Sequence, residues 1–103
     1  MANKPALTVA TLRASTSQQQ PPAGLDAPLA ALWHAAKGEW DKAHELVQDD
    51  ESKTAAWVHA HLHRVEGDQG NAGFWYRRAG RPASSLALDA EWNEIAGALL
   101  AST

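Results

Sequence analysis

The sequence predicts an all-α fold of about five short helices, and three observations support this prediction. Apolar side chains recur at the three- and four-residue spacing of an amphipathic helix over most of residues 26–103. No stretch alternates convincingly between apolar and polar residues, as a half-buried strand would. Glycines divide the chain into helix-length segments, and we interpret Gly38, Gly67 and Gly80 as residues at which helices end.

The first two predicted helices lie on either side of Gly38. Asp26 can cap the first of them, because its carboxylate can accept a free N–H group of the first turn, where Pro28 is also tolerated. The apolar residues of this helix are Leu29, Leu32, Trp33 and Ala36. The second helix is short and stops in the acidic run at residues 49–51. Its apolar residues are Trp40, Ala43, Leu46 and Val47.

Three more helices are predicted after residue 51. Ser52 is a good cap for the third helix, which ends at Gly67. Its apolar stripe consists of Val58, Leu62 and Val65. Either Asp68 or Asn71 caps the fourth helix, which ends at Gly80 shortly before a proline. The last helix has its apolar residues at Leu88, Trp92, Ile95, Ala96 and Leu99.

The first 25 residues differ from the rest of the chain. They contain Lys4 and Arg13 but no acidic residue, and they are rich in serine, threonine, glutamine and proline. This segment has little apolar material to offset its ordering entropy, so we predict a disordered tail at 1–25 and a single helical-repeat domain at 26–103. Two alternatives stay open, an organelle transit peptide and a tail that docks on another subunit.

Length, charge and cysteine content exclude several classes of function. A chain of 103 residues predicts one domain. The absence of cysteine excludes disulfides, thiolate zinc sites and a cysteine nucleophile. The formal net charge of −3 argues against nucleic acid as a partner. No segment is apolar for long enough to span a bilayer, so we expect no membrane association and a cytoplasmic location.

A repeat relates the first four helices. When Gly38 is placed over Gly67, an offset of 29 residues, Ala43 falls over Ala72 and Val47 falls over a tyrosine. Each unit then consists of a helix, a glycine, an acidic residue and a second helix. The small alanine allows two helix axes to approach closely.

This pattern resembles the tetratricopeptide superfamily of helical repeats, and its second unit is most similar to the Sel-like branch. The residues that carry the resemblance in that unit are Asp68, Ala72, Trp75, Tyr76, Arg77, Arg78, Ala79 and Gly80. The resemblance covers roughly residues 29–80 and implies two antiparallel helical hairpins of tetratricopeptide-like type plus a C-terminal capping helix. The chain departs from the family in its short offset and in having only two units. Two units are few for an independent array, so we expect the chain either to close into a small bundle or to dimerise.

The histidines of the third helix are candidate metal ligands. His59 and His63 are four residues apart and therefore share a helix face, and Glu66 continues this face. Two imidazoles and a carboxylate suit zinc or another divalent metal. The alternative is that both histidines border the apolar stripe and only form hydrogen bonds to neighbouring helices. His44 has no second potential ligand at a useful spacing in the sequence, so we interpret it as a structural or surface residue.

The arginines at the end of the fourth helix form the main concentration of positive charge. Together with neighbouring rings they could clamp an anionic or aromatic group. Alternatively, they are the exposed face of an amphipathic helix. The ligand or partner surface predicted on this basis contains His59, His63, Tyr76, Arg77 and Arg78.

From these observations we expect a small, non-catalytic interaction module without a cofactor, which binds a protein partner or a second copy of itself as a homodimer. The alternative is a metal- or small-molecule-binding protein, with an enzyme included in that class. It would use His59, His63 and Glu66, with zinc as the first metal to consider.

Overall fold

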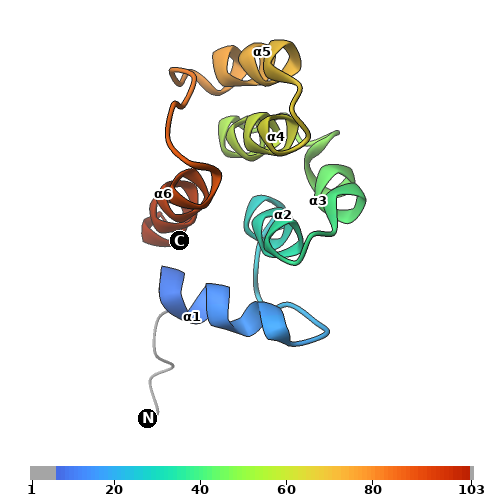
Figure 1. Cartoon of the computed structure of the whole chain (residues 1–103). Helices are drawn as coiled ribbons and strands as arrows, with labels where there is room; N and C mark the ends of the chain where they lie inside the picture. The colour runs from blue at the N-terminus through green and yellow to red at the C-terminus, as the bar shows by residue number, and fades with distance from the viewer. Residues whose placement is uncertain (1–6, 103) are drawn as a thin grey trace.

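The computed structural model describes residues 7–102, which form six α-helices, one short 3-10 helix and no strand (Figure 1). The α-helices are α1 (Val9–Ala14), α2 (Ala27–Ala36), α3 (Trp40–Val47), α4 (Lys53–Val65), α5 (Gln69–Ala79) and α6 (Leu88–Ala101). The predicted all-α class is therefore confirmed. Helices α2 to α6 lie where helices were predicted, and α1 makes the number of α-helices six instead of about five. Asp26, Ser52 and Asp68 each accept a backbone N–H at the start of their helices, as predicted.

The turn between α2 and α3 and the turn between α4 and α5 have the same backbone geometry. Gly38 and Gly67 have φ angles of 82° and 84°, a left-handed conformation that favours glycine. The N–H of Glu39 donates to the carbonyl of His34 at 2.9 Å, and the N–H of Asp68 donates to the carbonyl of His63 at 2.8 Å. Each glycine thus closes its helix and reverses the chain direction.

Helix α4 lies at the centre of the structure and contacts α2, α3, α5 and α6. Nine of its thirteen residues are buried, because α4 directs a face at each of these four neighbours. Ala43 on α3 and Ala72 on α5 are buried, so both helices approach closely at a small residue. No helix of the described residues has the length and apolar character needed to cross a membrane.

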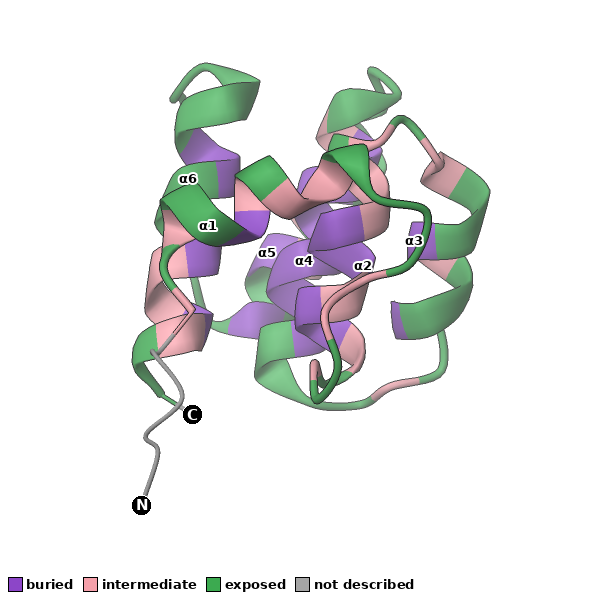
Figure 2. Cartoon of the chain, turned by 90° about the horizontal axis from the view of Figure 1, so that it is seen from below, coloured by how far each residue is buried: buried purple, intermediate pink, exposed green. Residues whose placement is uncertain are grey.

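Helix α1 is a correction to the expected disordered tail. Residues 9–14 are helical, and the side chain of Leu12 is completely buried. Seen from below, α1 crosses over α2 and α6 (Figure 2), and it contacts both helices. Trp33 on α2 donates to Ser15 Oγ at 3.0 Å, and Lys37 donates to the carbonyls of Thr16 and Gln18. The partners that order this segment lie far along the sequence, so its own composition did not reveal them. Residues 1–6 of the predicted tail lie outside the described residues.

The five tryptophans fall into two groups. Trp33, Trp57 and Trp92 are buried in the core, and Trp92 also donates to the carbonyl of Leu32 at 2.7 Å, which ties α6 to α2. Trp40 and Trp75 are only half-buried, and both contact histidine rings. Three of the tryptophans therefore fill the core, and the other two enclose a polar cluster.

Candidate metal centre

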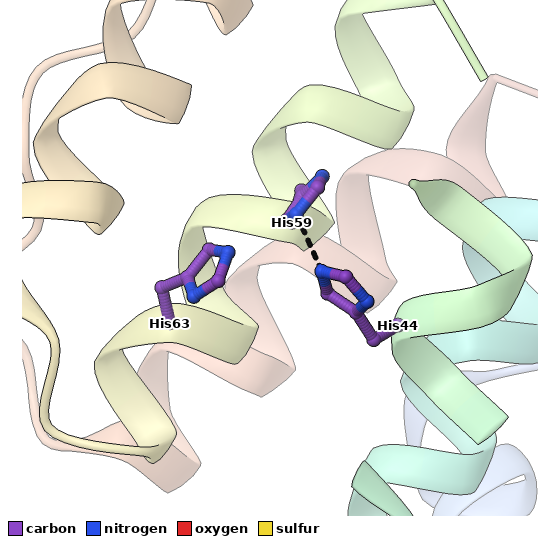
Figure 3. A group of neighbouring side chains, drawn as sticks. All are labelled: His44, His59 and His63. Atoms are coloured by element: carbon purple, nitrogen blue, oxygen red, sulfur yellow. Dashed lines mark hydrogen bonds between the residues drawn. The ribbon is translucent and has the colours of Figure 1, made fainter. Parts of the chain in front are cut away.

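Three histidines come together between α3 and α4. His59 and His63 lie one turn apart on α4, and their rings stack with centroids 4.9 Å apart. His44 approaches them from α3 (Figure 3). One ring nitrogen from each of the three histidines lies within 4.8 Å of the other two, so all three can reach a single ion.

The local fold explains this convergence. The turn at Gly38 directs α3 back along α2, and buried Ala43 and Val47 place one face of α3 against the core. His44 lies on the same side of α3 as these residues and thus projects toward α4. The four-residue spacing of His59 and His63 aligns their rings on the face of α4 that meets α3.

Tryptophans enclose the cluster on two sides. Trp75 stacks on His59 with centroids 3.8 Å apart and an interplanar angle of 15°. Trp40 stacks on His44 with centroids 4.7 Å apart and an angle of 11°. His59 and His63 are only 3% and 5% exposed, whereas His44 is half-buried. The imidazoles therefore lie in a largely water-excluded aromatic environment.

The hydrogen bonds within the cluster are incomplete. The Nε2 atoms of His44 and His59 lie 3.0 Å apart, so one ring donates its proton to the lone pair of the other (Figure 3). The Nδ1 atom of His59 has no partner, and it is the one buried side-chain nitrogen or oxygen in residues 7–102 for which this is true. A buried polar atom without a partner typically costs about 1–3 kcal/mol, and this cost calls for an explanation.

The same environment keeps His44 and His59 neutral. Burial, together with the positive charges that His44 and His63 can carry, lowers the pKa of His59 to about 4. Burial also lowers the pKa of His44, and His63 adds to this shift. A neutral imidazole has the free lone pair that a metal ion requires, so protons compete weakly for these two rings at neutral pH.

Glu66 takes a different place from the one predicted. Its Oε1 atom lies 2.6 Å from Nδ1 of His63, and this carboxylate is partly exposed. If His63 donates its Nδ1 proton to this carboxylate, its Nε2 atom keeps a lone pair for a ligand. The structure brings His59 and His63 together as predicted, but the third ring is His44, and Glu66 orients His63 from outside.

Sequence reasoning missed His44 because it considered spacing within single helices. The available signal was the position of His44 on the same helical face as Trp40, Ala43 and Val47. This face was expected to be apolar and to contact another helix. A histidine on such a face points into the interior, where it can meet residues distant in sequence.

The predicted ligand surface is not brought together as one exposed face. Tyr76 is 2% exposed, and its hydroxyl donates to the buried carboxylate of Glu91 on α6. Arg77 and Arg78 are exposed on α5, and the guanidinium of Arg78 lies 5.5 Å from the Trp75 ring centroid. The histidines and Tyr76 therefore face the interior, whereas the arginines face solvent.

Glu91 is the centre of a second buried polar cluster that the sequence did not indicate. Its carboxylate is completely buried and lies 2.7 Å from Nδ1 of His61. It also accepts hydrogen bonds from Nη1 of Arg64, at 2.8 Å, and from the hydroxyl of Tyr76. These contacts connect α4, α5 and α6.

Comparison of the chain with known protein families, with curated proteins and with solved structures finds no match. The geometry and chemistry of the trihistidine cluster are therefore the basis for a functional conclusion.

Proposed function

We propose that this chain binds a divalent transition metal, with zinc as the leading candidate, through His44, His59 and His63. The observation that carries the proposal is the convergence of three buried or half-buried imidazoles, one ring nitrogen of each being within reach of a single ion. Imidazole nitrogen is a preferred zinc ligand. Tetrahedral zinc with Zn–N bonds near 2.1 Å holds its ligands about 3.4 Å apart, so the cluster needs only a small adjustment.

The metal serves a structural purpose in this proposal. His44 belongs to the α2–α3 pair, whereas His59 and His63 belong to the α4–α5 pair. An ion bound by all three residues cross-links the two pairs and stabilises their packing. Three protein ligands leave one position for water, but the low exposure of His59 and His63 limits access for a larger substrate. This supports a non-catalytic role.

We further propose that the cluster is built on a tetratricopeptide-like scaffold. The support for this scaffold is the equivalent geometry of the turns at Gly38 and Gly67 and the burial of Ala43 and Ala72, all at the predicted offset of 29 residues. In such a scaffold, consecutive hairpins stack side by side. The histidines occupy the contact between the two hairpins, and a metal there strengthens the short array where it is weakest.

Calorimetric titration of the chelator-treated full chain with zinc tests the metal proposal. We expect one ion per chain, and at a free zinc concentration of 100 times Kd the free energy of unfolding rises by about 2.7 kcal/mol. The variant His44→Ala should lose this binding, because it removes the ligand from α3. The variant His34→Ala is the matched control, since His34 lies outside the cluster and bonds to Glu39. An absence of heat together with an unchanged melting temperature in the wild type would refute the proposal.

A further inference from the structure

Helix α3 and the loop after it carry an acidic surface. Residues 39–51 contain six carboxylates and one lysine. Five of these carboxylates form no ion pair within the described residues: Asp41, Glu45, Asp49, Asp50 and Glu51. An apolar side chain, Leu46, is 37% exposed on the same helix. We call α3 and this loop the acidic face.

Helix α5 carries the opposite charge. Residues 69–88 contain no acidic residue, and Arg77, Arg78 and Arg81 are all exposed. None of these three arginines forms an ion pair with another described residue. Phe74 is 44% exposed on the same helix. We call α5 and residue 81 the basic face, and it matches the acidic face in both components, unpaired charge and one exposed apolar side chain.

The two faces do not neutralise each other within one chain. Helices α3 and α5 make no close backbone contact in residues 7–102, and both pack instead against α4 (Figure 1). Each face therefore keeps its charge for an external partner. A second copy of the chain supplies both complementary faces at once.

We propose that the acidic face of one copy docks on the basic face of a second copy, so that the chain self-associates. A single exposed ion pair contributes little to binding. The contact therefore depends on several pairs acting together and on burial of Leu46 and Phe74. Because the two faces are unlike, a two-fold dimer uses the contact twice, whereas a head-to-tail arrangement forms a closed ring or an open filament.

The charge of the chain favours a second copy over nucleic acid as the partner. The chain has a net charge of −3, and its acidic face repels phosphate. A nucleic acid would also leave Leu46 and the five unpaired carboxylates without a role. Self-association uses both faces, and it does not depend on the trihistidine cluster.

Sedimentation velocity over a range of concentrations tests this proposal, with a chelator present so that metal binding has no influence. We expect the average mass of the wild type to increase at least twofold with concentration at low salt. High salt should weaken the association constant by about tenfold or more, because it screens the charges. A wild type that stays monomeric at submillimolar concentration and low salt would overturn the proposal.

Charge reversal provides the specific test. The variant Arg77→Glu/Arg78→Glu and the variant Glu45→Lys/Asp49→Lys should each be impaired in self-association, because each then meets like charge. An equimolar mixture of the two should recover association. The reversed face of one variant is then opposite in charge to the reversed face of the other, and the two unchanged faces also attract each other. Glu94→Lys, which changes an exposed carboxylate on α6 outside both faces, should associate like the wild type. If the mixture associates no better than either variant alone, the proposed pairing of faces is wrong. Circular dichroism of each variant verifies that it is folded.

Discussion

Helix α4 contributes to two buried polar clusters that differ in one respect. On the side of α6, His61 and Arg64 meet Glu91, and every buried polar side-chain atom in that cluster has a partner in the protein. On the side of α3, His59 and His63 meet His44, and one buried nitrogen has no partner. The first cluster is complete as a structural element, whereas the second has capacity for a ligand.

The charges of the two clusters follow from this difference. Burial alone would raise the pKa of Glu91, but hydrogen bonds from His61, Tyr76 and Arg64 outweigh it and hold that pKa below its usual value. Burial, together with Glu91, raises the pKa of Tyr76. A charge is stable in the interior when several donors surround it, and the Glu91 cluster meets this condition. In the trihistidine cluster, burial lowers the pKa of His44 and of His59, so both rings are neutral at neutral pH and suit a cation that brings its own charge.

The largest expected effect comes from removal of the centre of the complete cluster. Glu91→Ala leaves Arg64 and His61 without their carboxylate, so we expect the free energy of unfolding to fall by roughly 3–5 kcal/mol. Urea denaturation monitored by circular dichroism measures this loss. Glu94→Ala, an exposed position on the same helix, should change stability by less than about 0.5 kcal/mol. A similar, small effect for both variants would show that the Glu91 cluster does not hold α6 in place.

The dependence of stability on pH separates the two clusters. His59 has a pKa of about 4 in the folded protein and an ordinary value of 6.5, so between these values the unfolded chain binds more protons. The metal-free protein should therefore lose up to about 3 kcal/mol as pH falls from 6.5 to about 4. The lowered pKa of Glu91 also stabilises the fold, but this stabilisation is lost at lower pH, only as pH falls below the ordinary carboxyl pKa of 4.5.

Chemical denaturation at several pH values in the presence of a chelator measures the free energy of unfolding in both pH ranges, from 6.5 to about 4 and below 4.5. The loss between pH 6.5 and about 4 should be smaller in His59→Leu, whereas the loss at lower pH should remain. If His59→Leu has the same profile as the wild type over the upper pH range, then His59 does not titrate as the structure indicates.

The sequence predicted the helices much better than it predicted either cluster. Local signals such as the cap at Ser52 and the left-handed glycine at position 67 define where helices begin and end. The pairing of His59 with His63 was also local, because both belong to one helix. His44 and Glu91 are brought to α4 by tertiary packing, from 15 and 30 residues away from their histidine partners. Helix α1 was missed for the same reason: it packs on α2 and α6, and Trp33 and Lys37 hold the residues that directly follow it.

The smallest expected effect compares His59 and His61, which are two residues apart and lie on different faces of α4. In the metal-free protein, His59→Leu removes the nitrogen that has no partner, so we expect the free energy of unfolding to stay the same or to rise by about 1 kcal/mol. His61→Leu is the matched control, because it makes the same chemical change but deprives Glu91 of a hydrogen bond. This variant should lose about 1–3 kcal/mol.

Zinc should reverse the order of benefit, because it stabilises the variant that is less stable without metal. It should stabilise His61→Leu by the same increment as the wild type, since the ligands are intact. It should leave His59→Leu unchanged, because only two imidazoles remain. Thermal denaturation with chelator and with zinc gives all four values. Equal destabilisation of the two metal-free variants would mean that the cluster around His59 is as complete as the cluster around Glu91.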